Sequence, residues 1–267
     1  MSRVSTVLAA AALVANCWVS TAQHSAPPSF QIQDQVLPGN TPDDDLHMKV
    51  LVNTNTNESV KVIHDFGGRL EAVRLLSKSR HVVKDVIHTH DNNASAVRAN
   101  VGWAGSMLAP FANRIANGTY TFEGTTHYLP RNEVRCNGTC DCALHGFLWN
   151  KTMAVAHQET TDDFAKLTLA YTFAGSEPGY PFVLNMTLTY VLSEQGLEVT
   201  VRAFNPSTTS ALPFFHSVHP YFKTDDVSQC IIEFDNCTGW NHLDMGPGCV
   251  DLSNVSKTVT KPIVDST

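Results

Sequence analysis

The sequence has no run of basic residues and carries little charge of either sign. Of its 267 residues, 16% are charged, and the net charge is −7. A chain without a basic patch is a poor partner for the phosphates of a nucleic acid or for an anionic membrane surface. We therefore expect neither nucleic acid nor a membrane as a partner.

Long apolar runs are also missing, except near the N-terminus. There, Arg3 precedes an apolar stretch at 7–14, and small residues ending at Ala22 offer a cleavage site. The stretch is well short of the roughly 20 apolar residues that a membrane-spanning helix needs. Residues 1–22 therefore predict a secretory signal peptide rather than a membrane anchor, and we expect the protein to be secreted and extracellular.

Cysteines and glycosylation sequons agree with an oxidising compartment. Removal of the leader would leave six cysteines, an even number that suggests disulfides, although six cysteines allow 15 pairings. A metal site among the first three is the alternative, but their spacing matches no standard zinc pattern. The cysteines are Cys136, Cys140, Cys142, Cys230, Cys237 and Cys249. Eight sequons occur, at Asn57, Asn93, Asn117, Asn137, Asn150, Asn185, Asn236 and Asn254.

No stretch repeats apolar residues with the 3.6-residue period of a long helix. Short alternating runs separated by turn residues predict strands instead, and the clearest hairpin joins 184–192 to 197–203. A second hairpin is predicted within 119–129, where turn residues surround Gly124. Further strands are expected at 48–52, 60–63, 70–76, 167–173 and 230–234.

These patterns predict one all-β domain over residues 46–267, a large antiparallel β-sandwich. Residues 23–45 are polar and contain several prolines, so we expect a flexible lead-in there. The segment 81–99 predicts a long surface loop, with His88 and His90 in solvent.

Two dense stretches carry side chains that could do chemistry. The first holds Asn113, Arg114 and, beyond the hairpin, His145. Arginine binds oxygens through a rigid fork of donors, and histidine exchanges protons near neutral pH. The second holds His216 and His219 among aromatic residues, and in an extended segment these two face opposite sides. We expect one of them in a pocket and the other buried; a zinc pair is the alternative, without an identified third ligand.

Four ordered strings resemble the aldose 1-epimerases, also called galactose mutarotases. They are NRIANGTYTFEGTTHYLPRN, ALHGF, PGYPFVLNMTLTYVLSEQGLEVTVRAFN and HPYF, and the agreement extends from about residue 47 onward. The resemblance implies a galactose mutarotase-like supersandwich that interconverts the α and β anomers of free hexoses such as glucose and galactose, with no metal or organic cofactor. The chain is also similar to the hexose-6-phosphate epimerases, which share the scaffold and the HPYF form.

Position by position, the resemblance implies six site residues. It makes His145 a contact to sugar oxygens and His219 the general acid at the ring oxygen. The residues that it implies for substrate binding are Asn113, Arg114, Tyr221 and Asp265.

The general base of the family is a glutamate well beyond the second histidine, in a region that this sequence does not match. We therefore expect a C-terminally truncated relative with weak or absent turnover, and a secreted, non-catalytic carbohydrate-binding protein is the alternative. A monomer or weak dimer is expected. Asn117 lies beside Arg114, so we expect its sequon to be unoccupied or to point outward, because a glycan there would crowd the pocket.

Overall fold

The computed structural model describes residues 27–77, 79–90, 93–133 and 141–229, with short strands at 231–232, 241–243, 255–258 and 265–266. Two antiparallel sheets dominate it, as predicted, with strand orders β1-β2-β3-β4-β5 and β11-β12-β13-β14. The first contains β1 (Phe30–Leu37), β2 (Leu46–Asn53), β3 (Glu58–Ile63), β4 (Arg69–Ser77) and β5 (Val82–Asp85). The second contains β11 (Ala154–Thr160), β12 (Phe164–Ala174), β13 (Val183–Ser193) and β14 (Gly196–Phe204).

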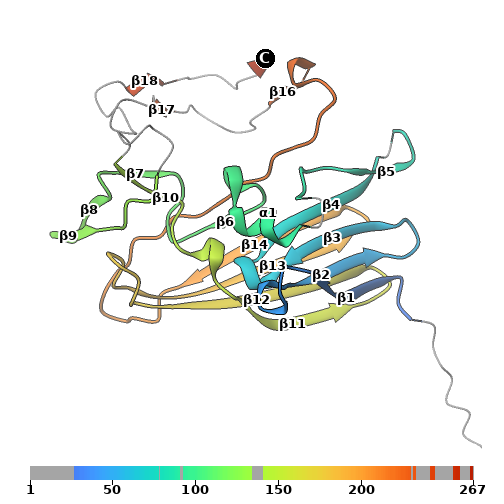
Figure 1. The fold of residues 1–267 in the computed structure, drawn as a ribbon, viewed down its shortest axis with the longest axis horizontal. Helices are drawn as coiled ribbons and strands as arrows, with labels where there is room; N and C mark the ends of the chain where they lie inside the picture. Colours follow the sequence, from blue (N-terminus) through green and yellow to red (C-terminus); the bar gives the residue numbers. More distant parts are fainter. Residues whose placement is uncertain are drawn as a thin grey trace, which may run out of the picture.

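Smaller strand pairs surround the sandwich, and β7 and β10 lie at one end of it (Figure 1). The pairs are β6 (Met107–Leu108) with β15 (Ser217–Val218), β7 (Arg114–Ala116) with β10 (Cys142–Leu144), β8 (Thr119–Phe122) with β9 (Thr125–Tyr128), β16 (Ile231–Ile232) with β19 (Asp265–Ser266), and β17 (Asn241–Leu243) with β18 (Val255–Thr258). In the described part of the chain there is one α-helix, α1 (Ala94–Ala99). Short 3-10 helices lie at Pro42–Asp44, His64–Phe66, Val101–Trp103, Leu148–Asn150 and Val227–Gln229. Among the described residues, no helix is long and apolar enough to cross a membrane.

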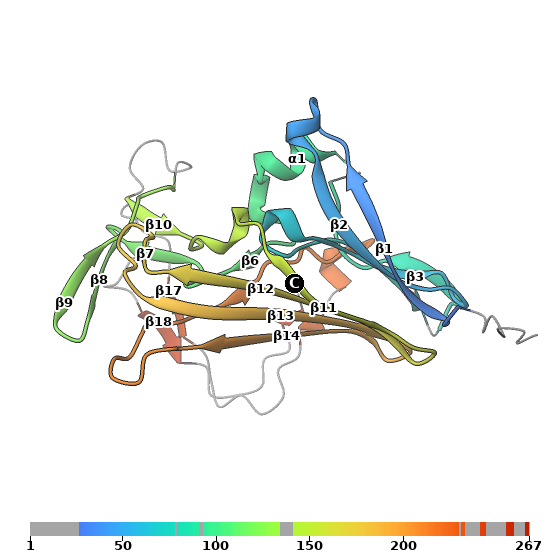
Figure 2. The same cartoon turned by 90° about the horizontal axis from the view of Figure 1, so that it is seen from below.

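Side-chain alternation in the second sheet builds the core. Along β13, buried residues alternate with half-buried ones over nearly the whole strand. Leu188 of β13 and Leu169 of β12 pack in one cluster with Leu51 and Val60 of the first sheet. Figure 2 shows β11–β14 as one layer and β1–β3 as another. Each fully buried Leu or Val side chain contributes about 1.5–3 kcal/mol, so this interior is the stable base on which the site is built.

Both predicted hairpins form. β13 and β14 pair along their length, from Asn185 opposite Phe204 to Ser193 opposite Gly196. In the β8–β9 hairpin, Glu123 and Gly124 have φ values of 47° and 79°. Positive φ at both central residues is the conformation that a two-residue turn needs to match the twist of the strands.

Two expectations for the N-terminal half are wrong. Phe30–Leu37, which we expected in the flexible lead-in, forms β1 and pairs with β2 at every residue. β1 is an edge strand whose middle residues are exposed and polar, so its sequence does not show the alternation of apolar residues that predicts a strand. The expected surface loop 81–99 contains β5 and α1, and His90 in it is nearly buried against the carboxylate of Glu71.

The predicted signal peptide and five of the six predicted disulfide cysteines lie outside the described residues. Cys142, the sixth, is buried on β10. The sequons at Asn137, Asn236 and Asn254 also lie outside.

Candidate active site

A pocket of about 410 Å³ opens beside the β7–β10 and β6–β15 pairs. It brings together five of the six predicted site residues from segments far apart in the sequence. Its lining comprises Gly102, Trp103, Leu108, Ala112, Asn113, Arg114, Glu133, Leu144, His145, Phe215, Ser217, His219 and Tyr221. Asp265, the sixth predicted residue, lies in β19, whose side chains the structure does not describe.

Asn113 and His145 are locked together at the ends of β7 and β10. Both have left-handed backbones, with φ values of 58° and 63°. The N–H of His145 donates to the carbonyl oxygen of Asn113 at 3.0 Å, and the N–H of Asn113 donates to Nδ1 of His145 at 3.1 Å. Asparagine tolerates this conformation better than most residues, which suits the Asn-Arg pair to the turn.

The same contact fixes the protonation of His145. A backbone N–H can only donate, so Nδ1 is the acceptor and the neutral ring carries its proton on Nε2. Burial, together with His219 and Arg114, lowers the pKa of His145 to about 4. Near neutral pH, His145 is therefore an uncharged ring that offers one N–H donor.

His219 faces His145, with ring centroids 5.3 Å apart. Its backbone is held on both sides: its N–H donates to the carbonyl of Ser106 at 3.0 Å, and its carbonyl accepts from Gly105 at 2.8 Å. Burial lowers the pKa of His219 below its usual value, and the charge of Arg69 lowers it further, against an opposing backbone hydrogen bond. The two rings are therefore in contact in one pocket.

Aromatic rings form the walls around this pair. Trp103 packs edge-on against His145, with centroids 4.8 Å apart, and Tyr221 stacks on His219 at 5.4 Å. Trp103 also contacts Trp149 at 5.0 Å, which fixes its position. Aromatic walls beside directed polar groups are typical of small-molecule sites.

Arg114 enters the pocket from β7 and forms an ion pair with a residue that we did not predict. Its Nη2 lies 2.7 Å from Oε2 of Glu133, and its Nη1 donates to Oδ1 of Asn113 at 3.2 Å. Glu133 follows Asn132, whose side chain bonds both the N–H and the carbonyl of Leu144, at 2.7 and 3.1 Å. No local pattern in the sequence singles out Glu133, because its contact with Arg114 is tertiary.

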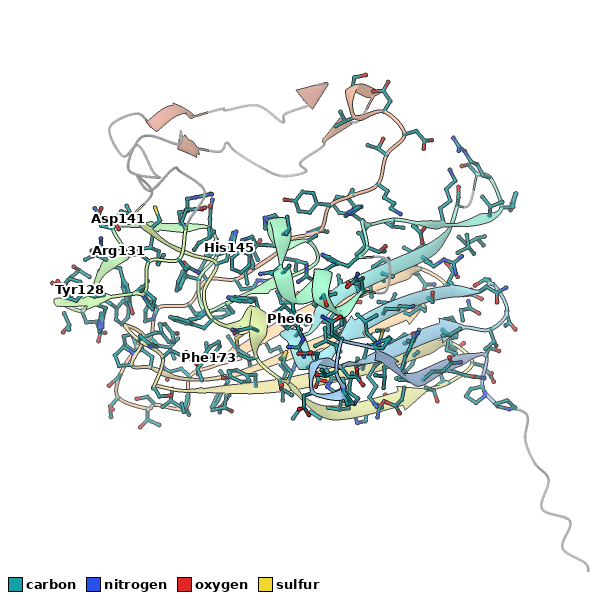
Figure 3. All side chains as sticks on the ribbon, viewed as in Figure 1. Phe66, Tyr128, Arg131, Asp141, His145 and Phe173 are labelled. Carbon is teal, nitrogen blue, oxygen red and sulfur yellow. The ribbon has the colours of Figure 1, made fainter. Side chains whose placement is uncertain are left out.

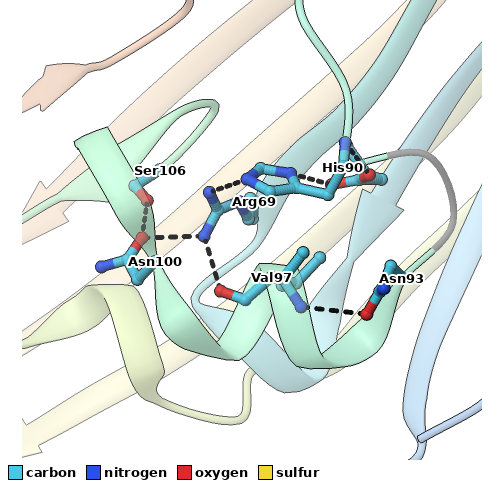
Figure 4. A network of polar contacts seen from close by, with 8 residues as sticks. Arg69, His90, Asn93, Val97, Asn100 and Ser106 are labelled. Carbon is cyan, nitrogen blue, oxygen red and sulfur yellow. Dashed lines mark hydrogen bonds and ion pairs between the residues drawn. The ribbon is translucent and has the colours of Figure 1, made fainter.

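A buried network supports the loop that carries Trp103 (Figure 4). Arg69, fully buried on β4, donates from Nη1 to Oδ1 of Asn100 at 2.9 Å, and Ser106 donates to the same oxygen at 3.3 Å. Nη2 of Arg69 lies 3.1 Å from His90, which contacts Glu71 at 2.9 Å. Because Ser106 also accepts from His219, the network links β4 to the pocket histidine.

His216 lies outside the pocket lining, as the opposite facing of the two histidines predicted. Its ring stacks on Phe214, and its Nε2 is buried with no hydrogen-bond partner. In the part of the chain that the structure describes, no group of three or more His, Cys, Asp and Glu side chains could hold a metal ion.

Asn117 is exposed in the turn after β7, with a φ of 56°, and its side chain is not part of the pocket lining. Occupancy of its sequon stays a prediction.

The aldose 1-epimerase family model matches residues 49–261. A probable aldose 1-epimerase of Arthroderma benhamiae is 27% identical, covering 59% of this chain and 37% of its own length. A maltose epimerase of Levilactobacillus brevis is 31% identical, and the match covers 45% of this chain and 33% of the relative. This chain therefore spans about a third of the length of these curated relatives.

Two solved structures share the fold. Galactose 1-epimerase from Lactobacillus acidophilus superimposes with a TM-score of 0.63 and 19% identity, covering 87% of this chain and 67% of that one. A galactose mutarotase-like protein from Clostridium acetobutylicum superimposes with a TM-score of 0.61 and 19% identity, and the match covers 82% of this chain and 62% of that one. The supersandwich is thus observed, and with four fifths of its residues matched by the family model the chain belongs to the aldose 1-epimerase family.

Proposed function

We propose that the protein is an aldose 1-epimerase that interconverts the α and β anomers of free hexoses such as glucose and galactose. The observation that carries the proposal is the contact of His145 and His219, 5.3 Å between ring centroids, in a pocket that also holds Arg114. Two histidines and an arginine can hold a polar ring and move a proton within it.

In the proposed reaction, the imidazolium of His219 gives its proton to the ring oxygen while a general base takes the proton of the anomeric hydroxyl. The C1–O5 bond breaks and an open-chain aldehyde forms. Rotation about the C1–C2 bond presents the other face of the carbonyl, and ring closure returns both protons. For the base, the resemblance implies a glutamate C-terminal to His219.

His145 and Arg114 have supporting roles in this proposal. The Nε2–H of neutral His145 and the guanidinium of Arg114 donate to sugar oxygens, on which negative charge grows as the ring opens. Donors fixed before the reaction stabilise such charge without reorganisation. The lock between Asn113 and His145 supplies that fixation.

A second function, sugar binding without turnover, is favoured by one observation. Among the described residues that line the pocket, the carboxylate is that of Glu133, and it is already paired with Arg114. We further propose that the protein acts outside the cell, since the N-terminal pattern and the sequons favour secretion.

Polarimetry tests the enzyme proposal. With a protein that includes the glutamate implied as the base, freshly dissolved α-glucose or α-galactose should reach anomeric equilibrium faster than without it. A rate equal to the spontaneous one contradicts the enzyme proposal, and calorimetry then decides whether the protein binds sugars without converting them.

A further inference from the structure

Glu133 is a buried acid for which the proposed reaction has no use. Its side chain is 2% exposed, and its carboxylate lies 2.7 Å from Nη2 of Arg114, whose side chain is 23% exposed. Removing a carboxylate from water is costly unless a cation or hydrogen bonds compensate. A charge kept in such a place at the wall of a pocket calls for a functional explanation.

The ion pair links β7 to the segment that contains Glu133, which lies beside β10. Arg114 and Leu144 are opposite each other in the β7–β10 register. Glu133 is fixed beside β10 because its N–H donates to the carbonyl of Cys142 at 3.4 Å and the side chain of Asn132 bonds Leu144. The guanidinium is therefore held by Glu133 and Asn113 before any ligand arrives.

We propose that Glu133 is a positioning and specificity-determining residue that orients Arg114 and balances its charge, so that the pocket accepts neutral aldoses and rejects anionic sugars such as hexose phosphates. The choice of substrate class rests on the proposed function. Glu133 acts through Arg114 rather than as the general base, because Arg114 engages its carboxylate and the side chain is almost inaccessible.

The charges around the pocket support a preference for neutral over anionic sugars. Of the described lining residues, Arg114 alone carries a permanent positive charge, and Glu133 offsets it. His145 is neutral at pH 7, since its pKa is lowered to about 4. An arginine without its carboxylate would be a good phosphate ligand. With the carboxylate in place, a phosphate dianion meets a like charge where the interior screens it weakly.

Glu133→Gln tests the inference, because it removes the charge and nearly keeps the shape. Asp141→Asn is the matched control. Asp141 pairs with Arg131, both side chains are about half exposed, and both lie toward the outer end of the molecule (Figure 3). The control makes the same change in net charge outside the pocket lining.

The readouts are binding of inorganic phosphate, glucose 6-phosphate and glucose, measured by calorimetry at low salt and by NMR of the His145 ring. We expect Glu133→Gln to raise the affinity for both phosphates by about tenfold or more and to weaken glucose binding, while Asp141→Asn matches the wild type. Unchanged phosphate affinity in Glu133→Gln, or an equal rise in Asp141→Asn, would overturn the inference.

The wild type alone supplies a second test if Glu133→Gln does not fold. We expect no saturable phosphate binding at His145 with a Kd of about 1 mM or tighter, and such binding would refute the charge balance. Inorganic phosphate has no anomers, so this measurement succeeds or fails independently of any epimerase activity.

Discussion

Single residues set the chemistry of the pocket, and His145 is the one whose state is best defined. Its Nδ1 accepts from Asn113, so the neutral tautomer carries its proton on Nε2. Burial is the main cause that lowers its pKa to about 4. We expect 15N NMR to find the ring neutral, with the proton on Nε2, down to near pH 4. Titration close to pH 6.5 would contradict the burial and the contact together.

The same shift predicts how stability depends on pH. The folded pKa lies below the unfolded value of 6.5, so the unfolded state takes up this proton first as the pH falls. The free energy of unfolding therefore keeps its full value above pH 6.5 with respect to this histidine, and it decreases as the pH falls toward 4. At about 1.36 kcal/mol for each pKa unit, the stability lost amounts to about 3 kcal/mol. Urea unfolding should be measured for the wild type and for His145→Gln at pH 7 and at pH 4. We expect the difference in unfolding free energy between the two proteins to change by about this amount between the two pH values. The same difference at both pH values would argue against the lowered pKa of His145.

The residues of the site were predictable to different degrees. Asn113, Arg114, His145, His219 and Tyr221 stand in short motifs, and the structure places all five in one pocket. Glu133 and Trp103 were missed because tertiary contacts, rather than local patterns, bring them to the pocket. The burial of His90 was not predicted, because its contact with Glu71 of β4 is tertiary and leaves no signal in the polar segment around His90.

Turns and strands hold these residues in place, and Gly146 tests one such turn. Its φ is 66°, and a Cβ there would lie 2.3 Å from the carbonyl oxygen of Ala109. Gly124 has a similar φ of 79°, but its surroundings are open. We expect Gly124→Ala to cost about 1 kcal/mol and Gly146→Ala about 3 kcal/mol, measured by urea unfolding. Equal costs would show that the close approach to Ala109 has no energetic effect.

Strand β4 offers a comparison between a buried and an exposed arginine. Arg69→Met removes the hydrogen bonds to Asn100 and Val97 and the contact with His90, so we expect a loss of about 3–5 kcal/mol. Arg74→Met breaks only a half-exposed pair with Asp85 and should cost less than about 1 kcal/mol. Thermal unfolding of both variants measures the contrast, and similar melting temperatures would deny the network a structural role.

Elements with strong alternation were predictable, and the others were not. β12 and β13 alternate buried side chains with more exposed ones, which the sequence displays directly. β1 lacks that signal because its middle residues are exposed at the sheet edge. The helix α1 has six residues, too few to show a helical period, and it depends on the side chain of Asn93 as its N-terminal cap.

At the scale of the whole molecule, the sandwich brings three distant segments to one pocket. Its lining includes residues 102–103, residues 112–114, 133 and 144–145, and residues 215, 217, 219 and 221. The sequence predicted the two-layer β architecture, because alternation reports burial on one sheet face. The convergence of the segments follows from pairings such as β6 with β15, which join residues about a hundred positions apart and leave no local trace.

The most direct measurement compares anomer interconversion by His219→Gln and His216→Gln, followed polarimetrically on fresh α-galactose. His219 lines the pocket, whereas His216 lies three residues away and does not. We expect His219→Gln to lose the acceleration by about 10²- to 10⁴-fold, as for a positioned proton donor, and His216→Gln to keep most of it. Equal rates for the two variants would contradict the assignment of His219 as the acid that opens the sugar ring.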